Sequence, residues 1–124
     1  YAAGSTVQGT TPRAALFRIN LDAVPVEFTP VWVDTDADRE ATACVAVKGG
    51  VLVGVEKASV AFVARVDLAT AALASPSLFT GWSDTAAEFR NGVRGLAKAG
   101  SYVFAATDDG ANGSLLRFAQ DGGF

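Results

Sequence analysis

The carboxylates at alternate positions of Asp34-Thr35-Asp36-Ala37-Asp38 are the clearest candidates for ion binding in this sequence. Hard divalent cations such as calcium coordinate several oxygens, and a loop can supply them at this short spacing. The segment departs from the EF-hand pattern, because Arg39 stands where that loop needs a glycine and Val45 where it needs a glutamate. Two interpretations remain open: a solvated charged loop, and a weak calcium site with Asp34, Asp36 and Asp38 as ligands.

Later polar segments hold the remaining candidates for binding. Asp108 and Asp109 precede Gly110, where an Asp-Gly turn and a ligand-facing pair of carboxylates are alternative explanations. Trp82 and Asp84 are further candidates for a ligand-facing surface, with packing between sheets as the alternative for the tryptophan. Asn112-Gly113-Ser114 is a formal acceptor for an N-linked glycan, provided that the protein is secreted by a eukaryotic cell.

No constellation for nucleophilic catalysis is present in the sequence. Histidine is absent, which excludes Ser-His and Cys-His pairs within this chain. The sequence also lacks a CxxC motif and a glycine-rich phosphate loop. Cys44 is the single cysteine and lies in an apolar run, which indicates a small buried hydrophobe and rules out an internal disulfide. We therefore predict no catalytic residue.

The overall composition limits the classes of partner. The chain has 124 residues, 50% of them hydrophobic, which fits one globular domain. Its formal net charge is −3 and its lysines and arginines form no dense cluster, so neither nucleic acid nor an anionic membrane surface is the expected partner. No apolar run is long enough to span a membrane. The chain begins at Tyr1 without a methionine, and we expect a processed product or a segment of a longer protein, located outside the cell or in the periplasm.

Short β-strands are the elements that must position these residues. A similar strand sequence occurs three times, each time with an arginine. These arginines, Arg18, Arg65 and Arg117, lie 47 and then 52 residues apart, a period typical of repeat arrays. Packing or ion pairing explains these arginines better than a ring of cations. Alternating hydrophobicity and turn residues such as Gly49-Gly50 predict strands over residues 15–21, 24–33, 42–47, 51–56, 60–68, 73–80, 92–98, 102–107 and 114–119.

The segments between the strands are predicted to be loops. Residues 5–13 are rich in Ser, Thr, Gly and Pro, and residues 34–40 and 81–91 are polar connectors with at most one helical turn over 85–89. The register also places the opening residues 1–4 at the end of a second strand. The domain prediction is a single β-repeat region over 1–124, made of a partial unit over 1–33, a full four-stranded unit over 41–80 and a partial unit over 92–124.

The segment Ala64-Arg65-Val66-Asp67-Leu68-Ala69-Thr70 resembles the turn between the third and fourth strands in β-propeller blades of the NHL, YVTN or lactonase-like kind. It departs from that pattern at Ala71, where a glycine usually follows the threonine. The resemblance implies an all-β chain of consecutive four-stranded antiparallel blades, incomplete in this chain, with a closed β-sandwich as the alternative fold. Roughly two and a half blades cannot close a ring. The implied partners are further blades, from the same parent protein or from identical copies.

In a propeller the connectors between blades share one face with the loops between second and third strands. That face would receive nine of the thirteen carboxylates: Asp34, Asp36, Asp38, Glu40, Glu56, Asp84, Glu88, Asp108 and Asp109. We therefore predict a binding or scaffold module that presents an acidic loop face to a protein, a glycan or a cation. The alternative is a fragment of a propeller enzyme, a lactonase-like or quinoprotein-like hydrolase or oxidoreductase.

Overall fold

The computed structural model describes residues 1–57, 60–68, 77–78, 92–108 and 111–120. Its described elements are all β-strands, which confirms the all-β prediction. The strands are β1 (Ala2–Gln8), β2 (Thr11–Asn20), β3 (Glu27–Val33), β4 (Glu40–Val47), β5 (Gly50–Lys57), β6 (Val60–Asp67), β7 (Ser77–Leu78), β8 (Val93–Ala99), β9 (Tyr102–Asp108) and β10 (Gly113–Ala119).

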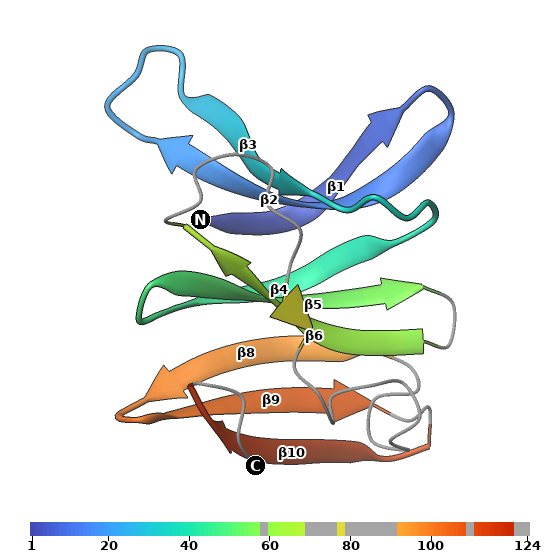
Figure 1. Ribbon diagram of the computed structural model, residues 1–124, viewed down its shortest axis with the longest axis vertical. Coiled ribbons are helices and arrows are strands. Elements are labelled where there is room, and N and C mark those ends of the chain that lie inside the picture. Colours follow the sequence, from blue (N-terminus) through green and yellow to red (C-terminus); the bar gives the residue numbers. More distant parts are fainter. Residues whose placement is uncertain (58–59, 69–76, 79–91, 109–110, 121–124) are drawn as a thin grey trace.

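The strands form three antiparallel sheets in chain order. The first sheet is β1-β2-β3, the second is β4-β5-β6-β7 and the third is β8-β9-β10. Figure 1 shows the sheets stacked one above another, with the second sheet between the other two. The described residues thus form three layers of sheet and not the two layers of the sandwich alternative. Arg18, Arg65 and Arg117 lie in β2, β6 and β10.

Two tight turns explain why neighbouring strands pair as hairpins. Val47 pairs with Gly50 and Ala99 pairs with Tyr102, so each turn contains two residues. Gly49 and Gly100 have φ of 74° and 58°, a region that glycine enters without the steric cost of a Cβ atom. The Gly-Gly signal at residues 49–50 therefore marks a real turn, although Gly50 itself begins β5.

The prediction of a loop over residues 5–13 is wrong. β1 continues to Gln8, β2 begins at Thr11, and the whole of β1 pairs with residues 11–17 of β2. The β-branched Thr6 and Val7 fit a pleated strand, and Gly9 with a φ of 70° allows the turn between the strands. The predicted helical turn over 85–89, the connector 81–91 and most of the strand predicted over 73–80 lie outside the described residues.

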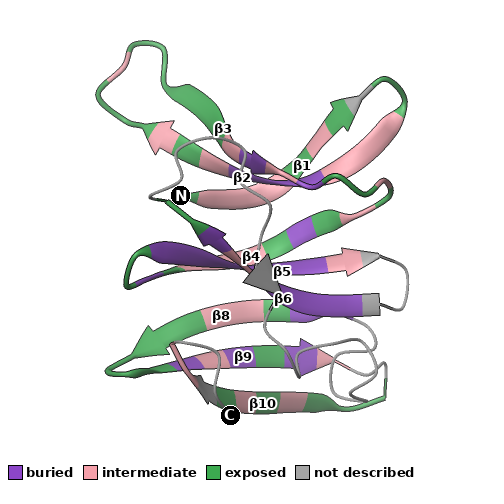
Figure 2. Cartoon of the chain, viewed as in Figure 1, coloured by how far each residue is buried: buried purple, intermediate pink, exposed green. Residues whose placement is uncertain are grey.

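The apolar core lies on both faces of the second sheet. Val51, Val53 and Val55 of β5 pack with Leu16 and Trp32 of the first sheet. Other residues of the second sheet, such as Leu52 and Val63, pack with Val93, Val103 and Ala105 of the third sheet. Figure 2 shows that buried residues concentrate in β5 and β6. Since both faces of β5 are covered, its sequence is a nearly continuous run of apolar residues and does not alternate between apolar and polar residues.

Gly54 of β5 lies where the second sheet packs closely against β8 of the third sheet. A Cβ atom built on Gly54 would lie 2.8 Å from both Cβ and Cγ1 of Val93. Beside it, the Thr42 hydroxyl donates to the carbonyl of Val93 at 2.7 Å. The absence of a side chain at Gly54 therefore permits this close packing of sheets.

Candidate functional site

The described turns lie on two opposite sides of the stack. Residues 9–10, 34–39 and 111–112 lie on one side, at the right of Figure 1, which we name the connector side. Residues 21–26, 48–49 and 100–101 lie on the other, which we name the turn side. For the described loops, this arrangement agrees with the sorting expected from the strand order.

Arg39 organises the connector loop that carries the predicted cation ligands. The Asp34 side chain is only 6% exposed, and its Oδ2 lies 3.2 Å from Arg39 Nη1. The Asp36 carboxylate lies 2.7 Å from Arg39 Nη2. The other Asp34 oxygen, Oδ1, accepts a hydrogen bond from the Asp36 amide at 3.0 Å. The guanidinium also lies 5.0 Å from the centre of the Phe62 ring, so the loop is anchored to the second sheet.

The same loop is tied to the start of β2. The Asp38 amide donates to the Pro12 carbonyl at 2.8 Å, and Asp38 has a φ of 60°. Arg13 donates to the carbonyls of Asp34 and Thr35. The geometry therefore brings Asp34 and Asp36 together around an arginine, and a divalent cation at these carboxylates would have to displace it. In the described part of the chain, no three His, Cys, Asp or Glu side chains group as a metal site would require. The cation site stays a prediction.

A second ion-pair cluster joins the second and third sheets on the connector side. Arg94 of β8 lies 3.7 Å from Glu56 and 3.6 Å from Asp108. Gly92, with a φ of 140°, leaves the space that the Glu56 carboxylate occupies. Asp108, expected to face a ligand, is thus engaged with an arginine that the sequence did not connect to it. The hairpin register offered a signal, because Val93 pairs with Thr107 and places Arg94 near the end of β9.

The other candidate residues divide between described and undescribed parts of the chain. Trp82, Asp84 and Asp109 lie outside the described residues. Asn112 is exposed just before β10, and its use as a glycan acceptor stays a prediction. Trp32 is buried at 1% exposure in the core, so packing explains this tryptophan.

Burial raises the pKa of the Cys44 thiol above its ordinary value, with smaller opposing effects from the N-terminal charge and a hydrogen bond with the Ala3 backbone. The thiol is half-buried in β4 beside the core, close to the first sheet. Cys44 therefore stays protonated at neutral pH and is a poor nucleophile, as its place in an apolar run indicates.

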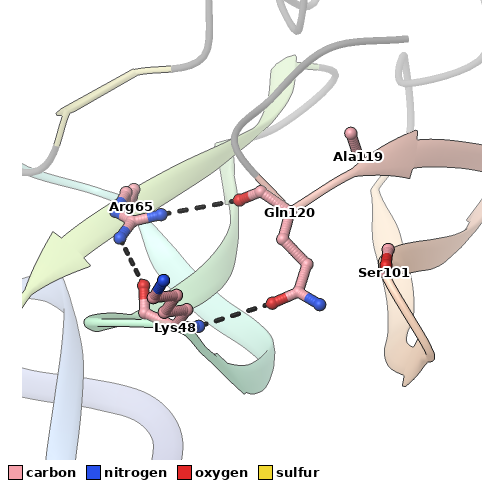
Figure 3. Close-up of a pocket in the computed structure, with 5 residues that line it drawn as sticks. All are labelled: Lys48, Arg65, Ser101, Ala119 and Gln120. Carbon is pink, nitrogen blue, oxygen red and sulfur yellow. Dashed lines mark hydrogen bonds between the residues drawn. The ribbon is translucent and has the colours of Figure 1, made fainter.

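A pocket of about 490 Å³ opens on the turn side, between the second and third sheets. Its described lining residues are Lys48, Arg65, Ser101, Ala119 and Gln120 (Figure 3). Arg65 donates to the Lys48 carbonyl at 2.7 Å and to the Gln120 carbonyl at 3.5 Å. This pocket was not predicted, because it depends on how two sheets stack. The recurring arginine and the lysine at the hairpin turn were the available signals.

Gln120 joins the two walls of this pocket. Its side-chain oxygen accepts from the Lys48 amide at 3.4 Å, and its side-chain nitrogen donates to the Gly100 carbonyl at 2.9 Å. The Gln120 amide donates to the Ser101 carbonyl at 3.3 Å. One polar residue of the pocket lining therefore bridges the turns of the second and third sheets.

Comparison with protein-family models, with curated proteins and with solved structures found no match to this chain. Among the described residues, no helix has the length and apolar character needed to cross a membrane.

Proposed function

We propose that this chain is a binding and scaffold module that forms a segment, or one protomer, of a larger β-propeller. The observation that carries the proposal is the contrast between the middle sheet and the end sheets. Val53 and Leu52 on the two faces of β5 are both fully buried. Phe28 in the first sheet is 62% exposed and Leu115 in the third sheet is 69% exposed. Large apolar side chains exposed on this scale are typical of surfaces that bind a partner.

The exposed residues of the first sheet lie on its face away from the core. Successive side chains of a strand point to opposite faces, and Leu16 packs in the core, so Phe17 and Ile19 point away from it. Phe28 pairs directly with Ile19 and Pro30 pairs with Phe17. We name this surface, made of Phe17, Ile19, Phe28 and Pro30, the first open face.

The third sheet has a corresponding outer surface. Leu116 packs in the core, so its neighbours Leu115 and Arg117 point away from it. They pair with Ala106 and Phe104 respectively, and the Arg117 guanidinium lies 4.8 Å from the centre of the Tyr102 ring. We name this surface, made of Tyr102, Phe104, Ala106, Leu115 and Arg117, the second open face. The two open faces differ, so contact between copies would be head-to-tail, the arrangement that generates rings.

In this proposal the connector side presents loops to a further partner, a protein, a glycan or a cation. The ion pairs leave this side less acidic than its composition suggests, since Arg39 and Arg94 together contact Asp34, Asp36, Glu56 and Asp108. Glu40 is exposed there and contributes a further carboxylate. A location outside the cell or in the periplasm stays a prediction.

The particle mass measured by light scattering between about 5 and 200 µM tests this proposal. We expect a mass above that of the 12.7 kDa chain, increasing with concentration, and a return to the monomer mass in Phe28→Asp. The matched control is Val7→Asp, because Val7 is 64% exposed but shares a face of β1 with Ala3, which packs against the core. A wild-type monomer at every concentration, or equal dissociation by the control, would contradict the proposal.

A further inference from the structure

The pocket on the turn side is lined by two cations, Lys48 and Arg65, that contact no carboxylate of a described residue. Among described residues, the Lys48 side chain has no hydrogen bond or ion pair, since its contacts are made by its main chain. Arg65 is held by two main-chain carbonyls and contacts no described carboxylate. On the connector side, by contrast, Arg39 and Arg94 each contact two carboxylates. The described lining of the pocket therefore contains two cations and no carboxylate, in a chain of net charge −3.

Ser101 and Arg65 of the pocket can donate hydrogen bonds to a bound anion. The Ser101 hydroxyl has no hydrogen-bond partner within the described part of the chain. Gln120 holds the turns that carry Lys48 and Ser101 at a fixed separation. A guanidinium has five N–H donors, so the two carbonyl contacts of Arg65 leave others available. The set combines a point charge, a planar guanidinium and a hydroxyl, which are the groups that bind oxyanions in proteins.

We propose that this pocket binds an oxyanion, the carboxylate or phosphate group of a ligand. Lys48 and Arg65 supply the charge, Ser101 donates a hydrogen bond, and Gln120 maintains the geometry. The site lies between two sheets of the same chain, so it does not depend on the ring proposed above. Asp67 follows Arg65 by two positions and shares its face of β6, so the affinity is expected to be modest, roughly millimolar.

A titration followed by ¹H–¹⁵N correlation spectra tests the proposal. Sodium phosphate and sodium acetate are added separately at constant ionic strength, because exposed charge interactions are screened by salt. We expect saturable shifts in the amides of Lys48, Ser101 and Gln120, including the side-chain amide of Gln120. Tighter binding of phosphate would identify a phosphate ligand, and equal or tighter binding of acetate a carboxylate. Shifts that rise linearly with either salt would overturn the proposal.

The decisive variant is Lys48→Gln, because the main chain of Lys48 makes the structural contacts and its exposed side chain makes none of those described. We expect it to weaken binding about 3- to 5-fold, which is the upper part of the range for one exposed ion pair. The matched control is Lys98→Gln, which makes the same charge change at an exposed residue of β8 outside the pocket lining. Equal weakening by the control would indicate a diffuse field and not a site, and would overturn the proposal.

Discussion

Replacing Gly54 with alanine would place a methyl group where the second and third sheets touch. The added Cβ would lie 2.8 Å from two carbon atoms of Val93, closer than real Cβ contacts allow. Val93 is fully buried on β8, and its carbonyl accepts the hydrogen bond from Thr42, so β8 cannot shift without loss. The substitution must therefore separate the sheets or strain the strands.

The expected cost is set by two opposing effects. Overpacking a well-filled core costs about 1–3 kcal/mol. Alanine also restricts the unfolded chain more than glycine does, which stabilises the fold by about 0.4–1 kcal/mol. We expect a net loss of about 1–2 kcal/mol in the free energy of unfolding, measured by urea denaturation at 25 °C. For a urea m-value of about 2 kcal/mol/M, the midpoint should fall by roughly 0.5–1 M.

Two comparisons isolate the contact. Gly95→Ala is the matched control, because among the described residues its Cβ would meet only Ala106, at 4.0 Å. It should leave the free energy of unfolding within about 0.5 kcal/mol of the wild type or raise it. Val93→Ala alone should cost about 1.5–3 kcal/mol, from two lost methyl groups and a cavity. Combined with Gly54→Ala, it should cost at least about 1 kcal/mol less than the sum, because the new methyl group gains the vacated space. The close packing of β5 on β8 would be refuted if Gly54→Ala left the free energy of unfolding unchanged, or if the costs of Gly54→Ala and Val93→Ala were strictly additive.

The remaining predictions concern the connector loop and the thiol. Arg39→Gln should lower the free energy of unfolding by about 1–3 kcal/mol, because it leaves the buried Asp34 carboxylate without its cation. Arg94→Gln should lower it by under about 1 kcal/mol, because the Arg94 side chain is 52% exposed. Millimolar calcium should leave the melting midpoint of the wild type unchanged and raise that of Arg39→Gln; a rise in the wild type that Asp36→Ala abolishes would show that calcium displaces the arginine. Because burial raises the pKa of Cys44 in the folded state, the protonated thiol favours folding below the ordinary thiol pKa of 9.0, and this contribution is lost as pH rises through the higher folded-state pKa. Folded Cys44 should also react with iodoacetamide more slowly than the urea-unfolded chain at the same pH, and equal rates would contradict its burial.

The sequence predicted the strands well because their signals are local. Alternation and apolar runs located β5 and β9, and the glycines at 49 and 100 marked the turns beside them. The prediction over residues 5–13 was wrong because serine, glycine and proline are typical of turns, and they outweighed the threonines and valine that favour a strand. The long β1–β2 hairpin is stabilised by the pairing of its two strands and by contact with β4 of the second sheet. Composition alone does not reveal these contacts.

Contacts between sheets could not be predicted from local patterns. Arg39, Asp34 and Asp36 lie within one short segment, so their ion pairs could have been predicted from the sequence. The carboxylates considered alone suggested a cation site instead. Arg94 contacts residues from two different sheets, and Gln120 links turns that are 52 positions apart in the chain, Lys48 and Gly100. The Arg94–Asp108 pair follows from the β8–β9 hairpin register, whereas the Arg94–Glu56 pair and the contacts of Gln120 with Lys48 and Gly100 become visible only after the stacking of the sheets is known.

Hydrogen exchange at two protein concentrations tests most directly whether the first and third sheets, and not the second, bind neighbouring copies of the chain. At both concentrations the amides of β5 should exchange slowest and at equal rates, because its side chains are already covered on both faces. The amides of β3 and β10 should exchange more slowly at the higher concentration, as their sheets become covered by neighbouring copies. Exchange in β3 and β10 that does not change with concentration, or exchange in β5 as rapid as in β3, would contradict the account.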